Sequence, residues 1–375
     1  MISSDTDKTL PVVHAQHGKV DGQKFWAVVI GIDGYKTSPL RGCISDAEMV
    51  AEYLKTDLHI PENHIQLLLS TDSKEFTESV NKPVSSCCDF AVELTDERIS
   101  KPIRANIIEA ILGLSTNTGI QHGENILIYF AGHGTTYECA NYLQYKNGAK
   151  PAAALGTIEA LCPIDRGPKP TTTGSTNPPD TNDANSSVTS DPQVPDISDW
   201  EINTILAEIA RTKGNHITFI LDCCHSFSIT RGPQEGVRVR AIMPLPSSSI
   251  TAMFSAADQK FEHLAGYQSI SEASWRAKMD SHVVLAACKE FEYAKEGTVE
   301  GDSRFNGAFT QALISAFKSA DKLNDKSMTY YKLMLMAASS MPTNAAQHPV
   351  IAGEQKELRL WFQDDDSSNS NVSSD

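Results

Sequence analysis

Short, wholly apolar runs alternate along the chain with longer stretches in which apolar residues recur every three or four positions. The runs are typical of buried strands, and the longer stretches are typical of helices with one apolar face. Strands are expected at residues 25–32, 65–69, 125–131, 216–221, 282–287 and 358–362. Helices are expected at residues 44–54, 101–114, 201–211, 307–316 and 328–340. This order of elements predicts a largely parallel sheet.

Two of the expected strands, NILIYFA at 125–131 and HITFIL at 216–221, show no alternation of apolar and polar residues. A strand of this kind is buried on both faces, so helices must cover the sheet from both sides. The pattern therefore predicts an α/β fold with three layers, in which a mostly parallel central sheet is flanked by helices. One domain over residues 23–363 accounts for these elements.

Three segments lack both kinds of pattern. Residues 1–22 are polar and are expected to form a flexible leader, and residues 364–375 are expected to form an acidic disordered tail. Residues 167–195 are rich in Pro, Thr, Ser, Asn and Asp and hold few large apolar side chains. Such a segment buries too little surface to offset the entropy lost on ordering, so we expect a disordered insertion there.

The net charge of the chain indicates which classes of binding partner to expect. The 375 residues include 32 Lys and Arg against 47 Asp and Glu, a formal net charge of −15. Nucleic-acid binding needs clustered positive charge, so this balance argues against it and favours basic protein or peptide partners. No apolar run approaches the length of a membrane span, and the first residues lack the features of a secretory signal, so no membrane partner is expected.

The eight cysteines are spread over the chain without the spacing of a disulfide scaffold or of a CxxC pair. They are Cys43, Cys87, Cys88, Cys139, Cys162, Cys223, Cys224 and Cys288. Reduced thiols in a cytoplasmic or nuclear compartment are therefore expected.

Side chains suited to catalysis follow two of the expected strands. Gly132-His133-Gly134 follows the run at 125–131, and Asp222-Cys223-Cys224 follows the run at 216–221. Sites in open α/β sheets lie beyond the carboxyl ends of the strands, so the imidazole and a thiol are expected to meet there. A neighbouring imidazole activates a thiol as a nucleophile. The amides of Gly134 and of the nucleophile could donate to the oxyanion of a tetrahedral intermediate.

These residues resemble the motifs of metacaspases, the caspase-like cysteine peptidases of fungi, plants and protists. The similar segments are LRGCISDA at 40–47, AGHG at 131–134 and DCCHS at 222–226, supported by GIDGY at 31–35, HVVLAAC at 282–288, NGAFTQAL at 306–313 and QHPVIAG at 347–353. They occur in the family's order across most of residues 24–362. The chain lacks the QACRG signature of animal caspases.

The resemblance implies a caspase-like fold and a cysteine endopeptidase that works through a Cys-His dyad and an acyl-enzyme. His133 resembles the general acid and base, and Cys224 resembles the nucleophile. Cys43, Asp46 and Asp222 match the pocket that accepts Arg or Lys before the cleaved bond. Two carboxylates suit a guanidinium, because each charge-assisted hydrogen bond contributes about 1.5 to 3 kcal/mol.

Three positions depart from the family pattern. Phe227 stands where Gly is usual and would narrow the cleft, and Ala131 stands where Ser is common. Many metacaspases also bind calcium as an activator, and Asp165 and Asp199 are the nearest matches to its ligands. Arg231 stands where another acidic ligand is expected, which weakens a site that wants six to eight oxygens. The chemistry itself implies no required cofactor.

Alternatives remain open. The chain could be an inactive caspase-like module whose cleft binds basic segments without cutting them, or a redox sensor that uses Cys223 and Cys224. Zinc at these adjacent cysteines is disfavoured, because neighbouring ligands rarely reach tetrahedral geometry. The segment 228–281 offers basic residues for self-processing: Arg231, Arg238, Arg240, Lys260, Arg276 and Lys278. We expect a monomer, since pairing through an edge strand is not general among metacaspases.

Overall fold

The computed structural model describes the parts of the chain that carry the predicted elements. The described residues are 20–70, 99–138, 157–168, 193–224, 238–265, 267–269, 272, 275–289, 292–298, 304–323, 327–342 and 346–362. Most of the predicted leader, residues 169–192 of the predicted insertion and the whole acidic tail lie outside them. His225, Phe227 and Arg231 also lie outside them, so the predictions made for these residues stay predictions.

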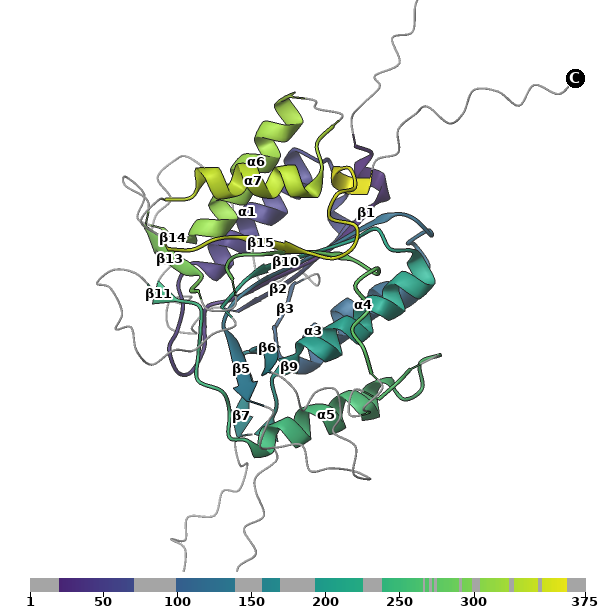
Figure 1. The fold of residues 1–375 in the computed structure, drawn as a ribbon, viewed down its shortest axis with the longest axis vertical. Helices are drawn as coiled ribbons and strands as arrows, with labels where there is room; N and C mark the ends of the chain where they lie inside the picture. The colour runs from purple at the N-terminus through teal and green to yellow at the C-terminus, as the bar shows by residue number, and fades with distance from the viewer. Residues whose placement is uncertain are drawn as a thin grey trace, which may run out of the picture.

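A seven-stranded sheet forms the centre of the molecule (Figure 1), and its strand order is β15-β12-β10-β4-β1-β2-β3. Its strands are β1 (Phe25–Ile32), β2 (Ile65–Ser70), β3 (Ile99–Ser100), β4 (Asn125–Ala131), β10 (Ile217–Asp222), β12 (Val283–Ala286) and β15 (Val350–Ala352). All neighbours pair in parallel except β12 and β15, which pair antiparallel. The predicted mostly parallel sheet is therefore confirmed.

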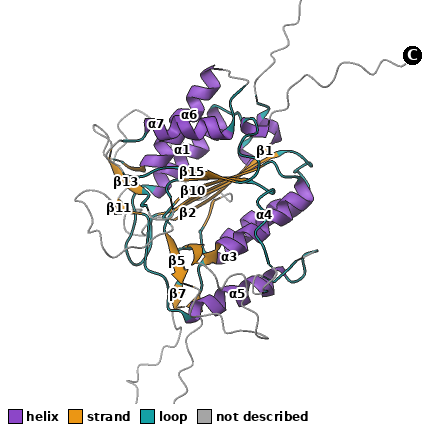
Figure 2. Cartoon of the chain, viewed as in Figure 1, coloured by secondary structure: helices purple, strands orange, loops and turns teal. Residues whose placement is uncertain are grey.

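Helices cover both faces of this sheet (Figures 1 and 2). One layer holds α1 (Cys43–Thr56), α6 (Ala308–Leu323) and α7 (Tyr330–Ser340), and the other holds α3 (Arg104–Thr116) and α4 (Asp199–Lys213). Helix α5 (Ser248–Phe261) lies on the side of α3 and α4 but farther from the sheet. Every residue of β10 is buried, as is all of β4 except its first residue. The absence of polar alternation in these two strands thus reflects burial on both faces, and the predicted three-layer α/β fold is confirmed.

Short antiparallel ribbons surround the carboxyl end of the sheet. One contains β5 (Gly134–Glu138), β6 (Thr157–Leu161) and β9 (Ile197–Ser198), and another contains β11 (Arg238–Val239), β13 (Lys295–Thr298) and β14 (Phe305–Gly307). A third pairs β7 (Gly167–Pro168) with β8 (Gln193–Val194). Both ends of the predicted insertion are therefore paired, which corrects its boundaries.

The expected last strand at 358–362 is wrong. The final sheet strand is β15, and the chain ends its described part in a short 3-10 turn, η4 (Leu360–Phe362). Trp361 and Phe362 have φ values of 60° and 49°, which an extended strand does not allow. A short apolar run predicts burial but does not distinguish a strand from a buried turn. The sequence pattern does not predict α5.

None of the described helices is long and apolar enough to cross a bilayer.

Trp361 joins three elements of the fold. Its ring centroid lies 5.6 Å from that of Phe25 in β1, 5.0 Å from Phe317 in α6 and 6.2 Å from Tyr330 in α7. The residue is 2% exposed. This packing attaches the end of the domain to the layer formed by α6 and α7.

Replacing this indole tests that role. Trp361→Ala should lower the free energy of unfolding by about 3 to 5 kcal/mol, because it leaves a cavity among three aromatic rings. Leu358→Ala is the matched control, because Leu358 is 48% exposed, and it should change stability by about 0.5 kcal/mol or less. Urea denaturation measures both. Equal midpoints for the two variants would contradict the structural role of Trp361.

Candidate active site

The two motifs that follow β4 and β10 lie side by side because the strands are neighbours. Ala131 and Asp222 are register partners at the carboxyl ends of these strands. The backbones that follow are in close contact, since a Cβ on Gly134 would lie 2.1 Å from the carbonyl oxygen of Cys224. Only glycine fits there. Residues from both motifs therefore converge at one edge of the sheet.

His133 is buried and oriented by backbone contacts. Its ring atom Nε2 lies 2.7 Å from the carbonyl oxygen of Ser38, and its amide donates to the hydroxyl of Tyr35 at 2.9 Å. A carbonyl only accepts, so Nε2 carries the proton and Nδ1 is left as a base. Nδ1 is buried and has no partner in the described part of the chain. Burial lowers the pKa of His133 to about 4, so the ring is neutral at pH 7.

Ser38 contacts the ring of His133, and no sequence motif marks it. Its backbone is in the left-handed region, with φ 57°, and its carbonyl oxygen fixes the tautomer of His133. The contact comes from the main chain, so the identity of the side chain gives no signal for it. An unusual φ of this kind is visible only in the structure.

Cys224 is wholly buried, and its thiol is held by a backbone group. Sγ accepts a hydrogen bond from the amide of Ala294 at 2.8 Å and lies 3.4 Å from the carbonyl oxygen of the same residue. Sγ makes no hydrogen bond to the ring of His133, since within the described residues Nδ1 has no partner and Nε2 contacts Ser38. Burial, and next the thiol of Cys288, raise the pKa of Cys224 well above its usual value. The thiol is therefore protonated in this conformation.

One carbonyl group lies against both predicted oxyanion donors. The amides of Gly134 and Cys224 each donate to the carbonyl oxygen of Arg240 at 3.1 Å. Two amides converging on one oxygen can stabilise the negative charge that develops there during acyl transfer.

The side chain of Arg240 fills an acidic pocket. Nη2 lies 2.5 Å from Asp46 and 3.4 Å from Glu296, and Nη1 lies 3.0 Å from Asp222. All four side chains are fully buried. The structure therefore brings together Asp46 and Asp222, the two carboxylates expected at the pocket, and adds Glu296 and Arg240. No motif marks Glu296, and the sequence indicates Arg240 only as one of several basic residues in the segment 228–281.

The end of β14 and the first turn of α6 hold the two expected carboxylates. The amide of Gly307 donates to both oxygens of Asp46, at 2.8 and 3.0 Å. The hydroxyl and amide of Thr310 donate to Asp222 at 2.6 and 3.2 Å. A Cβ on Gly307 would lie 2.4 Å from Oδ2 of Asp222, so glycine is required between the carboxylates. The NGAFTQAL segment thus shapes the pocket.

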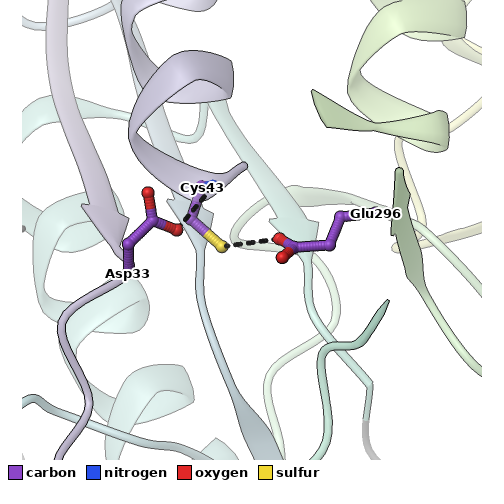
Figure 3. A group of neighbouring side chains, drawn as sticks. All are labelled: Asp33, Cys43 and Glu296. Atoms are coloured by element: carbon purple, nitrogen blue, oxygen red, sulfur yellow. Dashed lines mark hydrogen bonds between the residues drawn. The ribbon is translucent and has the colours of Figure 1, made fainter. Parts of the chain in front are cut away.

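Cys43 lies between Asp33 and Glu296 on one wall of the pocket (Figure 3). Their ligand atoms lie within 4.8 Å of one another, close enough to hold a metal ion. Asp33 already accepts from the amides of Cys43 and Ile44 at the start of α1, at 2.9 and 3.3 Å. Burial raises the pKa of Asp33 to about 6. We interpret this group as a wall that fixes the N-terminus of α1.

Residues 238–242 pass through the site, and their first two residues form β11. β11 pairs antiparallel with β13, in the register Arg238 with Glu296 and Val239 with Lys295. The amide of Arg240 donates to Ala294 at 3.1 Å, and the amide of Ile242 donates to Gly134 at 3.2 Å. Strand addition to a sheet edge is a common way to bind a peptide. The chain thus presents its own segment to the site in the manner of a bound peptide.

The two residues matched to calcium ligands, Asp165 and Asp199, lie in different local surroundings. Asp165 accepts from the amide of Arg104 at 2.8 Å, and the guanidinium of Arg104 lies 2.7 Å from Glu201. Asp199 begins α4. Among the residues that the structure describes, neither aspartate belongs to a close cluster of three acidic, His or Cys ligands. A neighbouring guanidinium also disfavours a second cation.

Comparisons with known proteins point to one family. A family model described as a caspase domain matches residues 24–358. A comparison with curated proteins finds no match. Among solved structures, the chain is similar to protein GSU0716 from Geobacter sulfurreducens, with 16% identity over 87% of this chain and 92% of that chain and a TM-score of 0.47. It is also similar to caspase-1 from Spodoptera frugiperda, with 9% identity over 98% of this chain and 100% of that chain and a TM-score of 0.41.

Removing the guanidinium should make stability depend on pH. Burial raises the pKa of Asp46 to about 7 even with the guanidinium in place, above the unfolded value of about 4. Arg240→Gln leaves the buried carboxylates without a cation, which raises their folded-state pKa further. The stability that such groups contribute is present below the unfolded pKa and is lost as pH rises through the folded pKa. Arg240→Gln should therefore cost about 3 to 5 kcal/mol at pH 8 and clearly less at pH 5.

Urea unfolding at both pH values, in a Cys224→Ala background that prevents cutting, measures this difference. Lys260→Gln is the control, because Lys260 pairs with Glu109 at the surface, where the two side chains are 40% and 73% exposed. It should change stability by about 0.5 kcal/mol or less at either pH. An equal loss for Arg240→Gln at pH 5 and pH 8 would contradict the ion cluster.

Proposed function

The chain belongs to the caspase-domain family of peptidases, and we propose that it is a cysteine endopeptidase that hydrolyses peptide bonds after arginine or, less often, lysine. Membership of the family supports cysteine-peptidase activity in general. The observation that carries the finer proposal is the position of Arg240. Its carbonyl oxygen accepts from two amides, while its guanidinium lies among buried carboxylates.

In the proposed reaction, Sγ of Cys224 attacks the carbonyl carbon of the substrate while Nδ1 of His133 accepts the thiol proton. The amides of Gly134 and Cys224 hold the oxyanion. The intermediate then collapses to an acyl-enzyme, and His133 gives its proton to the leaving amine. Water, deprotonated by His133, attacks the acyl carbon and releases the acid, which restores the thiol.

The described conformation is a resting state for this reaction. Sγ of Cys224 accepts a hydrogen bond from the amide of Ala294, and the side chain of Arg240 fills the pocket. The sulfur must leave Ala294 and reach His133 before attack, and an external substrate must displace residues 238–242. We propose that the Arg240–Ala241 bond is the first to be cut, in agreement with the self-processing expected for the basic segment 228–281.

The charge of the pocket favours a metacaspase-like peptidase over an animal caspase. Buried carboxylates would repel an aspartate before the cleaved bond and attract a guanidinium. Substrates are therefore proposed to be proteins or peptides with basic residues. Cys43 supports this pocket as part of its wall, since its thiol lies 3.9 Å from Glu296.

One observation favours a second candidate, a module that binds basic segments without cutting them. The thiol of Cys224 is buried and protonated, and its hydrogen bond is with Ala294 and not with His133. A basic segment also occupies the cleft. Turnover distinguishes the two candidates. A redox sensor at Cys223 finds no support, because burial raises the pKa of this thiol well above its usual value and disfavours the reactive thiolate.

Self-cleavage tests the proposed peptidase directly. The purified full chain should convert to two fragments that separate between Arg240 and Ala241, because this bond already lies against the amides of Gly134 and Cys224. Intact-mass spectrometry over time measures the conversion. Cys224→Ala should stay whole, and Arg276→Gln should be cut at the rate of the unmodified chain. The same fragments from Cys224→Ala would assign the cut to a contaminant.

Added peptides test specificity and the need for metal. The Arg240→Gln chain should hydrolyse a fluorogenic peptide that ends in Arg and should leave its Asp-terminated counterpart intact, because a segment without the guanidinium is held less tightly and an arginine side chain can displace it from the acidic pocket. Since no step uses a metal, rates after EGTA treatment should stay within about twofold, a barrier change well under 1 kcal/mol. Loss of activity that calcium restores would contradict this expectation. Saturable binding of the Arg peptide without turnover would favour the binding module.

A further inference from the structure

Glu296 adds a carboxylate to the pocket that the family-like motifs do not include. It lies on β13, is 1% exposed, and its Oε2 lies 3.4 Å from Nη2 of Arg240. Asp46 contacts the same nitrogen at 2.5 Å, and Asp222 contacts Nη1 at 3.0 Å. The guanidinium fork is therefore held at both terminal nitrogens, and two carboxylates share one of them.

The carboxylate of Glu296 is held in place before any substrate arrives. Its oxygens accept from the amides of Arg41 at 2.9 Å and Gly42 at 3.1 Å, in the loop that leads into α1. Its backbone pairs with Arg238 in the docked strand. One residue of β13 thus supports the backbone of the segment and contacts the side chain of Arg240. A polar group fixed in this way recognises its partner at little entropic cost.

This arrangement discriminates between the two basic side chains. Arginine presents a planar fork with separate terminal nitrogens, whereas lysine ends in one nitrogen at about the depth of the arginine Cζ atom. A lysine that reaches Asp222 therefore leaves the position of Nη2 empty. Asp46 and Glu296 would then be buried close together without a cation between them, which is costly. A third carboxylate penalises lysine more than it penalises arginine.

We propose that Glu296 is a third specificity residue, which makes the pocket select arginine over lysine at the position before the cleaved bond. The proposal rests on the proposed peptidase function and narrows its substrate class. Glu296 acts on binding of the side chain and takes no part in bond cleavage. Its loss should therefore change the ratio between the two substrates more than the rate for arginine.

The chain's own segment supplies matched substrates. Rates of self-cleavage after residue 240 are compared for the unmodified chain and for Arg240→Lys, each with and without Glu296→Gln. With Glu296 present, Arg240→Lys should slow cleavage by about tenfold or more, the effect of losing one charge-assisted hydrogen bond. With Glu296→Gln, which keeps an acceptor for the loop amides and removes the charge, the ratio should fall to about threefold or less. The exposed Glu357→Gln is the control and should leave the ratio unchanged.

The outcomes separate this proposal from the peptidase proposal. An unchanged ratio in Glu296→Gln, with the arginine form still cut, overturns the role of Glu296 and leaves the peptidase standing. If no form is cut, the peptidase proposal fails, and the pocket is then tested by urea unfolding in the Cys224→Ala background. There, the stability lost through Arg240→Lys should shrink when Glu296→Gln is added, and an equal loss overturns the proposal. If Glu296→Gln does not fold, Glu296→Asp, which shortens the side chain away from Nη2, takes its place in both measurements.

Discussion

A single buried guanidinium among three buried carboxylates is the constraint on which the site depends. The carboxylates come from α1, β10 and β13, and two of them are held by the amide of Gly307 at the end of β14 and the hydroxyl of Thr310 in α6. One cation does not offset the burial of three carboxyl groups, so the cluster depends on fixed hydrogen bonds to each of them. This requirement explains why segments far apart in the sequence converge on one point beyond the sheet. It also explains why glycine is needed at position 307, where a side chain would separate the carboxylates.

Burial also determines the charge state of the proposed dyad. It lowers the pKa of His133 and raises that of Cys224, so both groups are neutral in the described conformation. A preformed thiolate and imidazolium pair would be costly in such a dry site. The proposed reaction therefore transfers the proton as the sulfur attacks. Hydrogen bonding of Nε2 to Ser38 supports this sequence, because it leaves Nδ1 as the acceptor.

The fold is predictable because the segments with the clearest apolar patterns form the most buried elements of the structure. β1 and β4 match the predicted ranges residue for residue, since an unbroken apolar run has few alternatives in an α/β chain. The strand predicted at 358–362 is wrong because aromatic packing around Trp361 stabilises a turn in this apolar segment. In the site, motifs identify the side chains that carry chemistry. They do not identify Ser38, which acts through its carbonyl group, or Glu296, which reaches the pocket from a ribbon that no periodicity marks.

The docked segment is held from both sides of the proposed cleavage point, and hydrolysis would weaken both attachments. Before the bond, Arg240 contributes its guanidinium and its carbonyl oxygen; after it, Ile242 donates to Gly134. Cutting Arg240–Ala241 would separate these contacts into two chains, so binding on one side would no longer favour binding on the other. The cut would also place a new carboxylate on Arg240, beside the acidic pocket that holds its side chain. Repulsion between them favours release. The same pocket that fixes the segment in the intact chain would thus favour its exchange for another arginine once the bond is broken.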